Sequence, residues 1–343
     1  MAKYKSLKGQ PIQVLTADPP APVEGQVWVV ANPGTSSVMK GYRLAAGTWA
    51  SGGNMPTNWS LQGSFGTRDA TITGGGQYDP GSPGYSADSF TYNGTAWSDI
   101  AEINSLRSQS AGFGTAASGG IVGGYSNVSP AGNRDLVEEW NGTGWSERND
   151  LPTTISGAGS AGIYTAALVF GGSIPGITAT NKSFDGTNWT EVGDLNVARQ
   201  RSNGQSVGTQ TAALMIGGID PSRPGQEVEA WNGNSWTVSN TLNTARELGG
   251  GNGIQTSAIA VSGRNPPGSH AVTVNCEQWD GTSWTEVANV AAGRSYTSST
   301  GTGSGNPSTQ SLFYGGATTS STANTNATEE WNQALETISF DID

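Results

Sequence analysis

One motif recurs through the chain at nearly equal intervals. An aromatic residue, an Asn-Gly or Asp-Gly pair and a second aromatic occur together five times, with the second aromatic at Trp97, Trp145, Trp189, Trp236 and Trp284. The steps between these positions are 48, 44, 47 and 48 residues. A period of this size is typical of propellers and solenoids, in which each repeat packs on its neighbours. In such a protein, the surfaces and loops that several repeats form together are better candidates for function than any single local motif.

A pair of small residues after a short apolar run keeps the same period. It reads Thr73-Gly-Gly75, Val122-Gly-Gly124, Phe170-Gly-Gly172, Ile216-Gly-Gly218, Val261-Ser-Gly263 and Tyr314-Gly-Gly316. Asn-Gly or Asp-Gly between strand-like flanks indicates a tight hairpin in which both central residues have positive φ. Each repeat is thus predicted to hold four short strands: an inner strand, the apolar strand, and a hairpin that carries the two aromatics.

An apolar strand ending in Gly-Gly, followed by an aromatic and then a Trp, resembles the kelch repeat over residues 47–333. The resemblance implies a β-propeller. We predict an all-β, six-bladed kelch-like β-propeller closed by an N-terminal strand, with a short N-terminal β-hairpin arm. Because Trp49 keeps the period but has no repeat before it, we expect its strand to close the ring beside Trp331. The expected parts are an arm (1–46), the propeller (47–333) and a C-terminal strand (334–343).

Comparison among the repeats predicts buried ion pairs. A Glu two residues before the first aromatic occurs in repeats two, four, five and six, and these repeats also have an Arg at the start of the inner strand. Repeats one and three have neither. A planar guanidinium can satisfy both carboxylate oxygens. We expect the pairs Arg107–Glu138, Arg201 (or Arg199)–Glu229, Arg246–Glu277 and Arg294–Glu329; the rival interpretation is a ring of Arg at one mouth of the channel that receives an acidic ligand.

The repeated aromatics allow two interpretations. We expect Trp49, Trp97, Trp145, Trp189, Trp236 and Trp284 to pack between blades, because they occupy the most regular positions of the repeat. The alternative is a lectin propeller, in which Trp faces stack on sugar rings. The loops after the Gly-Gly pairs, such as Gln77 to Tyr85 and Ser173 to Gly176, are the candidate contact surface.

Composition excludes several classes of function. The net charge of -11 disfavours binding to nucleic-acid phosphates. One cysteine, Cys276, excludes an internal disulfide. No signal peptide and no membrane-spanning run is seen. The single histidine, His270, lies in a Pro/Gly-rich loop without the partners of a metal site or a catalytic triad. We expect no cofactor.

Catalytic motifs are weak. Ser183-Phe-Asp-Gly-Thr-Asn-Trp189 resembles the box of sialidase propellers, but its Trp comes one residue early. Glu138-Glu139 and Glu329-Glu330 are adjacent, and adjacent strand residues point to opposite faces, which does not suit the paired carboxylates of a glycoside hydrolase. The sequence predicts that the protein is not an enzyme.

The segments outside the repeats suggest docking. Pro-Val-Glu-Gly-Gln-Val-Trp28 leads into a short strand, and a second strand is expected from Val38 to Leu44. Near the C-terminus, Ile338, Phe340 and Ile342 alternate with polar residues, as in a half-buried strand that pairs with the arm or with a neighbouring subunit. We take these three residues and Trp28 as candidate docking residues.

The Pro-rich lead, Glu-Gly-Gln-x-Trp and the following Lys/Tyr strand resemble the opening of structural proteins of tailed bacteriophages. The resemblance implies a virion component made in the host bacterial cytoplasm. We expect a non-enzymatic structural or interaction protein, tail-associated or capsid-decorating, held to other virion proteins by the arm and the C-terminal strand. A host surface glycan or receptor is the other partner considered, without nucleic acid or membrane insertion. The alternatives are a carbohydrate-binding lectin and a glycan hydrolase.

Overall fold

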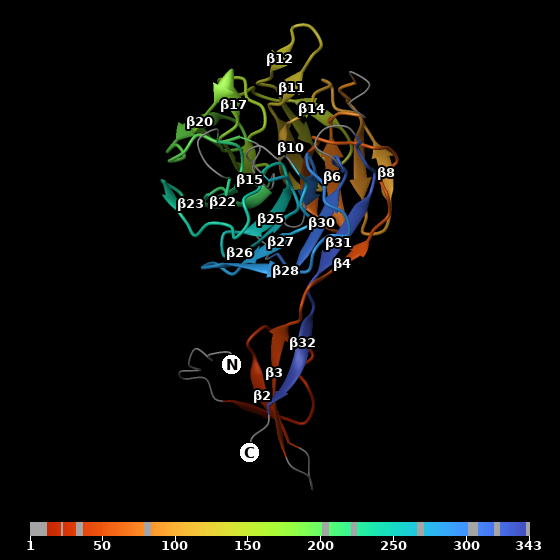
Figure 1. The fold of residues 1–343 in the computed structure, drawn as a ribbon, viewed down its shortest axis with the longest axis vertical. Coiled ribbons are helices and arrows are strands. Elements are labelled where there is room, and N and C mark those ends of the chain that lie inside the picture. Colours follow the sequence, from red (N-terminus) through yellow and green to blue (C-terminus); the bar gives the residue numbers. More distant parts are fainter. Residues whose placement is uncertain are drawn as a thin grey trace. The chain divides into compact units, whose positions relative to one another are not determined.

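The chain forms two compact units, seen in the computed structural model (Figure 1). The structure describes residues 12–21, 23–31, 37–78, 84–200, 206–220, 225–265, 271–300, 308–318 and 323–340. Unit 1 comprises Met1–Thr48 and Gln333–Asp343, and unit 2 comprises Trp49–Asn332. Unit 1 thus contains the expected arm together with the C-terminal strand, which the sequence analysis had pairing either with the arm or with a neighbouring subunit. Within the described ranges, no helix is long and apolar enough to cross a membrane.

Unit 1 is a small sheet in which the two ends of the chain pair. Its strand order is β1 (Gln13–Leu15), β2 (Val27–Val30), β3 (Val38–Leu44) and β32 (Leu335–Phe340). β32 runs antiparallel to β3, with Met39 opposite Phe340 and Leu44 opposite Leu335. The sheet explains how a marginal hairpin becomes stable, because the third and fourth strands cover edges that a lone hairpin leaves open.

Unit 2 is built from repeated four-stranded groups. In the described residues, repeats one, two and three each form one four-stranded sheet. The sheet of repeat one consists of β5 (Gly63–Thr67), β6 (Ala70–Gly74), β7 (Ser89–Tyr92) and β8 (Trp97–Ile100), and that of repeat two of β9 (Ala111–Thr115), β10 (Ser118–Val122), β13 (Val137–Trp140) and β14 (Trp145–Glu147). The sheet of repeat three consists of β15 (Gly159–Ile163), β16 (Ala166–Phe170), β19 (Asn181–Phe184) and β20 (Trp189–Val192).

Repeats four and five share one eight-stranded sheet, because their inner strands pair in parallel. The strands are β21 (Ser206–Thr209), β22 (Ala212–Ile216), β23 (Val228–Trp231), β24 (Trp236–Val238), β25 (Gly250–Ile254), β26 (Ser257–Val261), β27 (Cys276–Trp279) and β28 (Trp284–Val287). The last group has the order β29 (Ser298–Thr300), β30 (Gln310–Tyr314), β31 (Thr328–Asn332) and β4 (Thr48–Ser51). Short two-stranded ribbons, β11 (Tyr125–Ser126) with β12 (Gly132–Asn133) and β17 (Ser173–Ile174) with β18 (Gly176–Ile177), extend two loops.

The first strands of the repeats are neighbours around a common axis. β5 lies against β9, β9 against β15, and so on through β21, β25 and β29, and β29 lies against β5. The middle strands are buried on both faces; Ile121 and Val122 of β10, for example, are at most 1% exposed. This radial arrangement is a β-propeller-like fold.

The N-terminal strand completes the last group. β4 lies beside β31, and the ring centroids of Trp49 and Trp331 are 5.4 Å apart. The Trp49 indole also donates a hydrogen bond to the carbonyl oxygen of Ala288 at 3.0 Å. The predicted meeting of the segments near Trp49 and Trp331 is confirmed, and it removes an exposed strand edge from the fold.

Each Gly-Gly pair connects its repeat to the next one. The N–H of the second residue donates to the carbonyl oxygen at the start of the following repeat, and the six bonds are Gly76 to Arg107, Gly124 to Ile155, Gly172 to Arg199, Gly218 to Arg246, Gly263 to Arg294 and Gly316 to Trp59. The last of these bonds joins the final repeat to the first. In repeat one the pair is thus Gly75-Gly76, one residue beyond the sequence-based alignment.

The first residue of each pair meets the same carbonyl oxygen. A Cβ built on Gly171 would lie 2.5 Å from the carbonyl oxygen of Arg199, and the φ of Gly171 is +64°. Both conditions favour glycine. Ser262 occupies this position in repeat five at φ 54°, and its hydroxyl donates to the carbonyl oxygen of Arg294 at 2.9 Å. The serine hydroxyl thus forms a hydrogen bond with the carbonyl oxygen that would crowd an apolar side chain at this position.

The hairpins with the aromatic pairs differ from the prediction. Trp140 is directly opposite Trp145, which leaves a four-residue loop in place of a two-residue turn. Only the glycine has positive φ, 93° at Gly142. The Asn141 side chain accepts hydrogen bonds from the N–H groups of Thr143 and Gly144, both at 3.0 Å. Asn and Asp recur here because their side chains cap the loop.

We predict that Gly171→Ala destabilises the fold more than Gly171→Ser, although serine is the larger residue. Alanine meets the Arg199 carbonyl with no polar atom to offer, at a cost of about 2 kcal/mol. Serine can form the hydrogen bond that Ser262 forms. Urea denaturation of both variants gives the free energies of unfolding. A serine variant as unstable as the alanine variant would contradict this account of the motif.

Candidate binding site

The four repeats with a Glu before the first aromatic contain buried ion pairs. Arg107 Nη1 lies 2.6 Å from Glu138 Oε1. Arg294 Nη2 lies 2.7 Å from Glu329 Oε1. Arg246 Nη2 contacts Glu277 Oε1 in the same way. Both side chains of the Arg107–Glu138 and Arg246–Glu277 pairs are 0% exposed. Burial lowers the pKa of Arg107 and of Arg294, and the carboxylate partner opposes this shift. These arginines belong to the interior of their repeats, so the rival ring of Arg at a channel mouth is not formed.

In repeat four the partner of Glu229 is Arg199. The Arg199 Nη2–Glu229 Oε1 distance is 2.8 Å, and Arg199 is fully buried. Arg201, named first in the sequence interpretation, lies outside the described residues. The structural alignment gives the reason, because Arg199 is the residue whose carbonyl oxygen accepts the Gly172 N–H, as Arg107 does for Gly76.

The carboxylates also accept backbone hydrogen bonds from the segment before the Arg. Glu138 Oε2 accepts from the Asn104 N–H at 2.6 Å, and Glu329 Oε2 accepts from the Ala291 N–H at 2.8 Å. This donor stands three residues before the Arg. Repeats one and three have Pro56 and Pro152 at that position, which have no N–H to donate. The absence of Pro at this position is therefore a third sequence feature that accompanies the Arg and the Glu, and the comparison of repeats did not identify it.

Repeats one and three have other types of residue at the positions of the Arg and the Glu. In repeat one, Trp59 stands at the Arg position and Phe90 at the Glu position, with ring centroids 4.9 Å apart at 88°. In repeat three, Ile155 and Lys182 occupy these positions, and both are buried. Burial lowers the pKa of Lys182, whose Nζ donates to Thr180 Oγ1 at 3.3 Å.

The repeated aromatics are structural. Trp97, Trp145, Trp236 and Trp284 are at most 9% exposed, while Trp49 and Trp189 are half-buried. The indole of Trp145 donates to the carbonyl oxygen of Ala101 at 3.0 Å, and its ring packs with Trp140 at 5.4 Å. The same cluster holds Phe65 and Ile72 of the preceding repeat. These rings pack between repeats, so a lectin site formed by stacked Trp faces has no support.

The chain passes a ring of left-handed residues just after the Arg position. Leu61, Gln109, Gly157, Leu248 and Tyr296 have φ values of 61°, 58°, 61°, 59° and 56°. We call these residues the lip. Their backbones are connected across repeats: the N–H of Leu61 donates to Tyr296 at 3.1 Å, that of Gln109 to Leu61 at 2.8 Å, and that of Gly157 to Gln109 at 2.9 Å. These three bonds join Tyr296, Leu61, Gln109 and Gly157 through their backbones.

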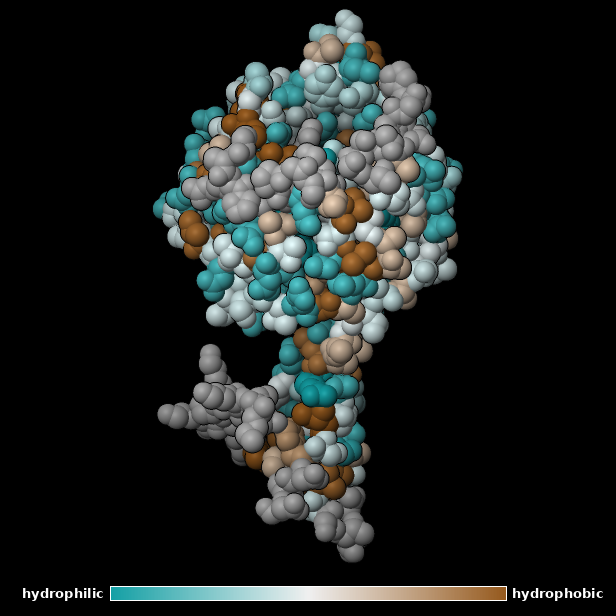
Figure 2. Space-filling view, viewed as in Figure 1, coloured by the Kyte–Doolittle hydropathy of each residue, from teal (hydrophilic) through white to brown (hydrophobic). Residues whose placement is uncertain are grey.

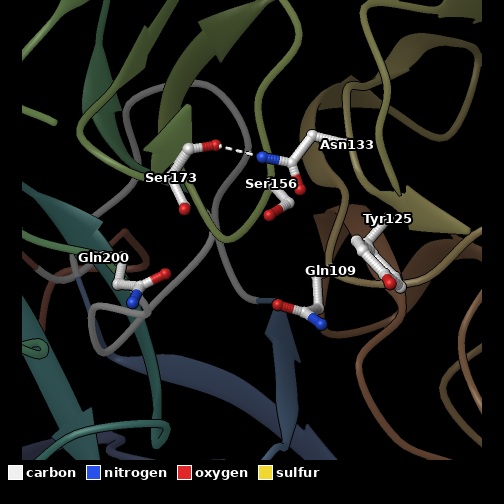
Figure 3. Close-up of a pocket in the computed structure, with 6 residues that line it drawn as sticks. All are labelled: Gln109, Tyr125, Asn133, Ser156, Ser173 and Gln200. Carbon is white, nitrogen blue, oxygen red and sulfur yellow. Dashed lines mark hydrogen bonds between the residues drawn. The ribbon is translucent and has the colours of Figure 1, made fainter. Parts of the chain in front are cut away.

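A hollow opens beside the lip (Figure 3). Its volume is about 300 Å³, and its described lining residues are Gln109, Tyr125, Asn133, Ser156, Ser173 and Gln200. Asn133 Nδ2 donates to the carbonyl oxygen of Ser173 at 2.7 Å, which fixes the amide plane. Tyr125 and Gln200 stand on opposite sides of the hollow (Figure 3). Ser173 comes from one of the loops predicted to form the contact surface, whereas most of the loop from Gln77 to Tyr85 lies outside the described residues.

The described lining residues of the hollow are polar and uncharged. Their amide and hydroxyl groups both donate and accept hydrogen bonds, and the Tyr125 ring adds an apolar face. Tyr125 is itself supported by Tyr85, with ring centroids 5.8 Å apart. His270 lies outside the described residues, and among those described no cluster of three or more His, Cys, Asp or Glu could hold a metal ion. Burial raises the pKa of the Cys276 thiol to about 11, so this cysteine is unreactive.

The predicted docking residues lie in unit 1 with different degrees of burial. Trp28 is 0% exposed, packs on Tyr42 at 4.5 Å and donates to Asp18 Oδ1 at 3.2 Å, so it belongs to the core of unit 1 and is not a free docking residue. Ile338 and Phe340 are half-buried on β32. Ile342 lies outside the described residues. Among the described residues of this unit, the exposed large apolar side chains are instead Ile12, Val14 and Val23, at 45%, 67% and 63% exposed. Apolar residues are visible on unit 1 in Figure 2, whereas on the face of unit 2 shown there they are scattered among polar ones.

These features define a β-propeller-like protein with a polar hollow at its lip. No family model and no curated protein matches the sequence. Among solved structures, the one described as "Structure of YjhT" is similar, with a TM-score of 0.65 and 16% identity over 80% of this chain and 95% of that one. At this identity the similarity shows a shared fold.

The comparison corrects the prediction that the protein is not an enzyme. That prediction relied on the lack of a recognisable carboxylate pair in the sequence. The chain shares its fold with YjhT over most of both lengths, and one fold hosts catalytic and non-catalytic proteins alike. Excluding catalysis from sequence motifs alone was wrong, and a non-enzymatic role is not carried forward.

We predict that Glu277→Ala lowers the free energy of unfolding by about 3–5 kcal/mol, because it leaves Arg246 buried without its carboxylate. The matched control is Glu336→Ala, since Glu336 pairs with Arg43 and their side chains are 41% and 64% exposed. Its loss is expected to cost less than about 1 kcal/mol. Denaturant unfolding of both variants makes the comparison, and equal losses would show that the internal pairs contribute no more than surface pairs.

We predict that Lys182→Met raises the free energy of unfolding at pH 7 by about 1 kcal/mol or more, because a buried charge is removed. The folded-state pKa of Lys182 lies below its ordinary value of 10.5, so the wild-type fold gains stability as pH rises through that window. The advantage of the variant should therefore be smaller at pH 10 than at pH 7. Lys40→Met, which removes a partly exposed lysine paired with Asp18, is the control. An advantage independent of pH would contradict the assignment.

Proposed function

We propose that this chain is an attachment component of a tailed-bacteriophage particle. Unit 1 docks on other virion proteins, and unit 2 contacts the host surface. The polar hollow on a rigid ring is the observation that carries the proposal. The residues that recur in each repeat are buried and maintain the fold, whereas the loops after the Gly-Gly pairs differ from repeat to repeat. Tyr125, Asn133 and Ser173 of these loops line one part of the hollow.

We further infer that unit 2 is a six-bladed kelch-like propeller. The six Gly-Gly hydrogen bonds support this inference, because each joins one repeat to the next and the bond from Gly316 to Trp59 joins the last to the first. The lip bond from Leu61 to Tyr296 supports the same closure. A rigid closed ring suits a binding module, because its loops keep their positions without a ligand.

Docking through unit 1 is supported by its edges and its exposed side chains. β1 and β32 are the outer strands of the sheet, and edge strands can pair with a further chain. Val14, on β1, is 67% exposed. The resemblance of this segment to openings of phage structural proteins gives the expected partner, and the site of synthesis is then the host cytoplasm.

The test is binding of the labelled full chain to intact cells of candidate host strains and to their extracted polysaccharides. We predict saturable binding that Val14→Asp leaves unchanged. The same variant should be lost from purified particles assembled in its presence, because it places a charge on the docking strand. The proposal fails if wild-type chain binds neither cells nor polysaccharide from any strain, or if the variant is incorporated like wild type.

Cleavage of a host glycan is a second candidate function. The fold by itself does not separate binding from catalysis, because one fold hosts many functions, and the polar hollow is the place where a glycan would be held. Incubating the full chain with extracted polysaccharide and measuring new reducing ends tests this candidate. Release above the level of heat-denatured protein supports it, and binding without release leaves attachment alone.

A further inference from the structure

The hollow coincides with the one described lip residue that has no side chain. Leu61, Gln109, Leu248 and Tyr296 carry side chains at the lip, whereas repeat three has Gly157. The hollow is lined by Ser156, immediately before Gly157, and by Gln109, whose carbonyl oxygen accepts the Gly157 N–H. On either side, the lining comes from repeats two and four, with Tyr125 and Gln200. The space therefore lies where a lip side chain is missing.

Glycine is not required at this position by the backbone. The φ of Gly157 is 61°, and Leu61 and Leu248 adopt 61° and 59° at the equivalent sites. The fold thus accommodates leucine in this conformation, although left-handed φ costs a branched residue about 1 kcal/mol or more. The neighbouring lip residue Gln109 lines the hollow with its side chain, and we infer that a side chain at position 157 would take up part of the same space.

We propose that this hollow binds one unit of a neutral saccharide and that Gly157 determines its access. The inference rests on the proposed contact with the host surface and names the class of ligand. The volume of about 300 Å³ is at the lower end of small-molecule sites, which suits a single sugar ring.

The chemistry of the lining selects hydroxyl groups. Each hydroxyl of a sugar both donates and accepts hydrogen bonds, as do the amides of Asn133 and Gln200 and the hydroxyls of Ser156 and Ser173. The half-buried Tyr125 ring offers a face for the C–H groups of a pyranose. Carboxylated sugars are disfavoured, because desolvating their charge needs a cationic partner and the described lining residues carry none.

A saccharide fits better than a peptide segment. Peptides are usually bound along a groove or a strand edge that pairs with their backbone. Here the Asn133 amide is already engaged with the backbone of Ser173, which closes one side of the hollow. The site is a short hollow between three repeats (Figure 3), so it takes a terminal or branching sugar unit.

We predict that Gly157→Leu weakens binding at least ten-fold without unfolding the protein. The full chain is titrated with glucose, galactose, mannose, rhamnose and N-acetylglucosamine, and with glucuronic acid as the acidic probe, by saturation-transfer NMR. Gly144→Leu is the matched control: it makes the same substitution in a hairpin loop that contributes no described lining residue, where an added Cβ would have nothing within 4 Å. Thermal melting checks that both variants fold.

A second variant covers the case in which Gly157→Leu fails to fold. Gln200→Ala shortens a half-exposed side chain of the hollow and is expected to weaken binding about five-fold, as for loss of one hydrogen bond. Unchanged affinity in the folded Gly157→Leu variant, or in Gln200→Ala, overturns the site. Glucuronic acid bound as well as the best neutral sugar overturns the ligand class.

Cell binding separates this inference from the proposed function. Loss of cell binding after periodate oxidation of surface sugars supports both the saccharide site and the attachment function. Binding abolished by protease and unaffected by periodate overturns the saccharide while attachment stands. If wild-type chain binds a neutral sugar through the hollow but no cell or polysaccharide, the site stands and the attachment function fails.

Discussion

The fold of unit 2 depends on one repeated contact, the hydrogen bond from the second residue of each Gly-Gly pair to the start of the next repeat. The bond brings two backbones so close that the first residue of the pair has almost no room for a side chain. In four repeats the accepting residue is the buried Arg, and this Arg also donates to its own repeat; Arg199 Nη1, for instance, donates to the carbonyl oxygens of Gly217 and Glu227 at 3.2 and 2.7 Å. One arginine thus connects the preceding repeat through its backbone and its own repeat through its side chain.

The internal comparison of repeats shows that the ion pair is replaceable but its geometry is not. Trp59 with Phe90, and Ile155 with Lys182, fill the space that Arg and Glu fill elsewhere. The carbonyl oxygens of Trp59 and Ile155 still accept the Gly-Gly hydrogen bond. A buried ion pair often contributes little net stability over apolar residues of similar volume, which explains why two repeats can do without it.

Much of the fold followed from the sequence, because it is repeated. The strand order within a repeat, the closure by Trp49 and the burial of Arg with Glu were all marked by periodic residues. The choice between Arg199 and Arg201 was not, because both stand near the start of the inner strand. The Asn-Gly loops were misjudged, since the residues between Trp140 and Trp145 do not reveal that the aromatics pair directly. Trp28 was taken for a docking residue because Asp18 and Tyr42, which bury it, are distant in sequence.

The hollow could not be predicted from the sequence, because the feature that distinguishes it is a missing side chain at position 157. Gly157 is one of 51 glycines, and only its alignment with Leu61, Gln109, Leu248 and Tyr296 in three dimensions makes it distinctive. The exclusion of enzymatic activity failed for a related reason: motifs report adjacent residues, whereas sites on a propeller are assembled from several repeats.

The pairing of β3 with β32 has a further consequence if the protein works outside a cell, as proposed. The chain passes between the two units twice, at Thr48–Trp49 and at Asn332–Gln333. A protease that cuts one of these crossings leaves the units covalently joined through the other. A single cut at either crossing therefore does not release unit 2, whereas it would do so in a protein with one linker.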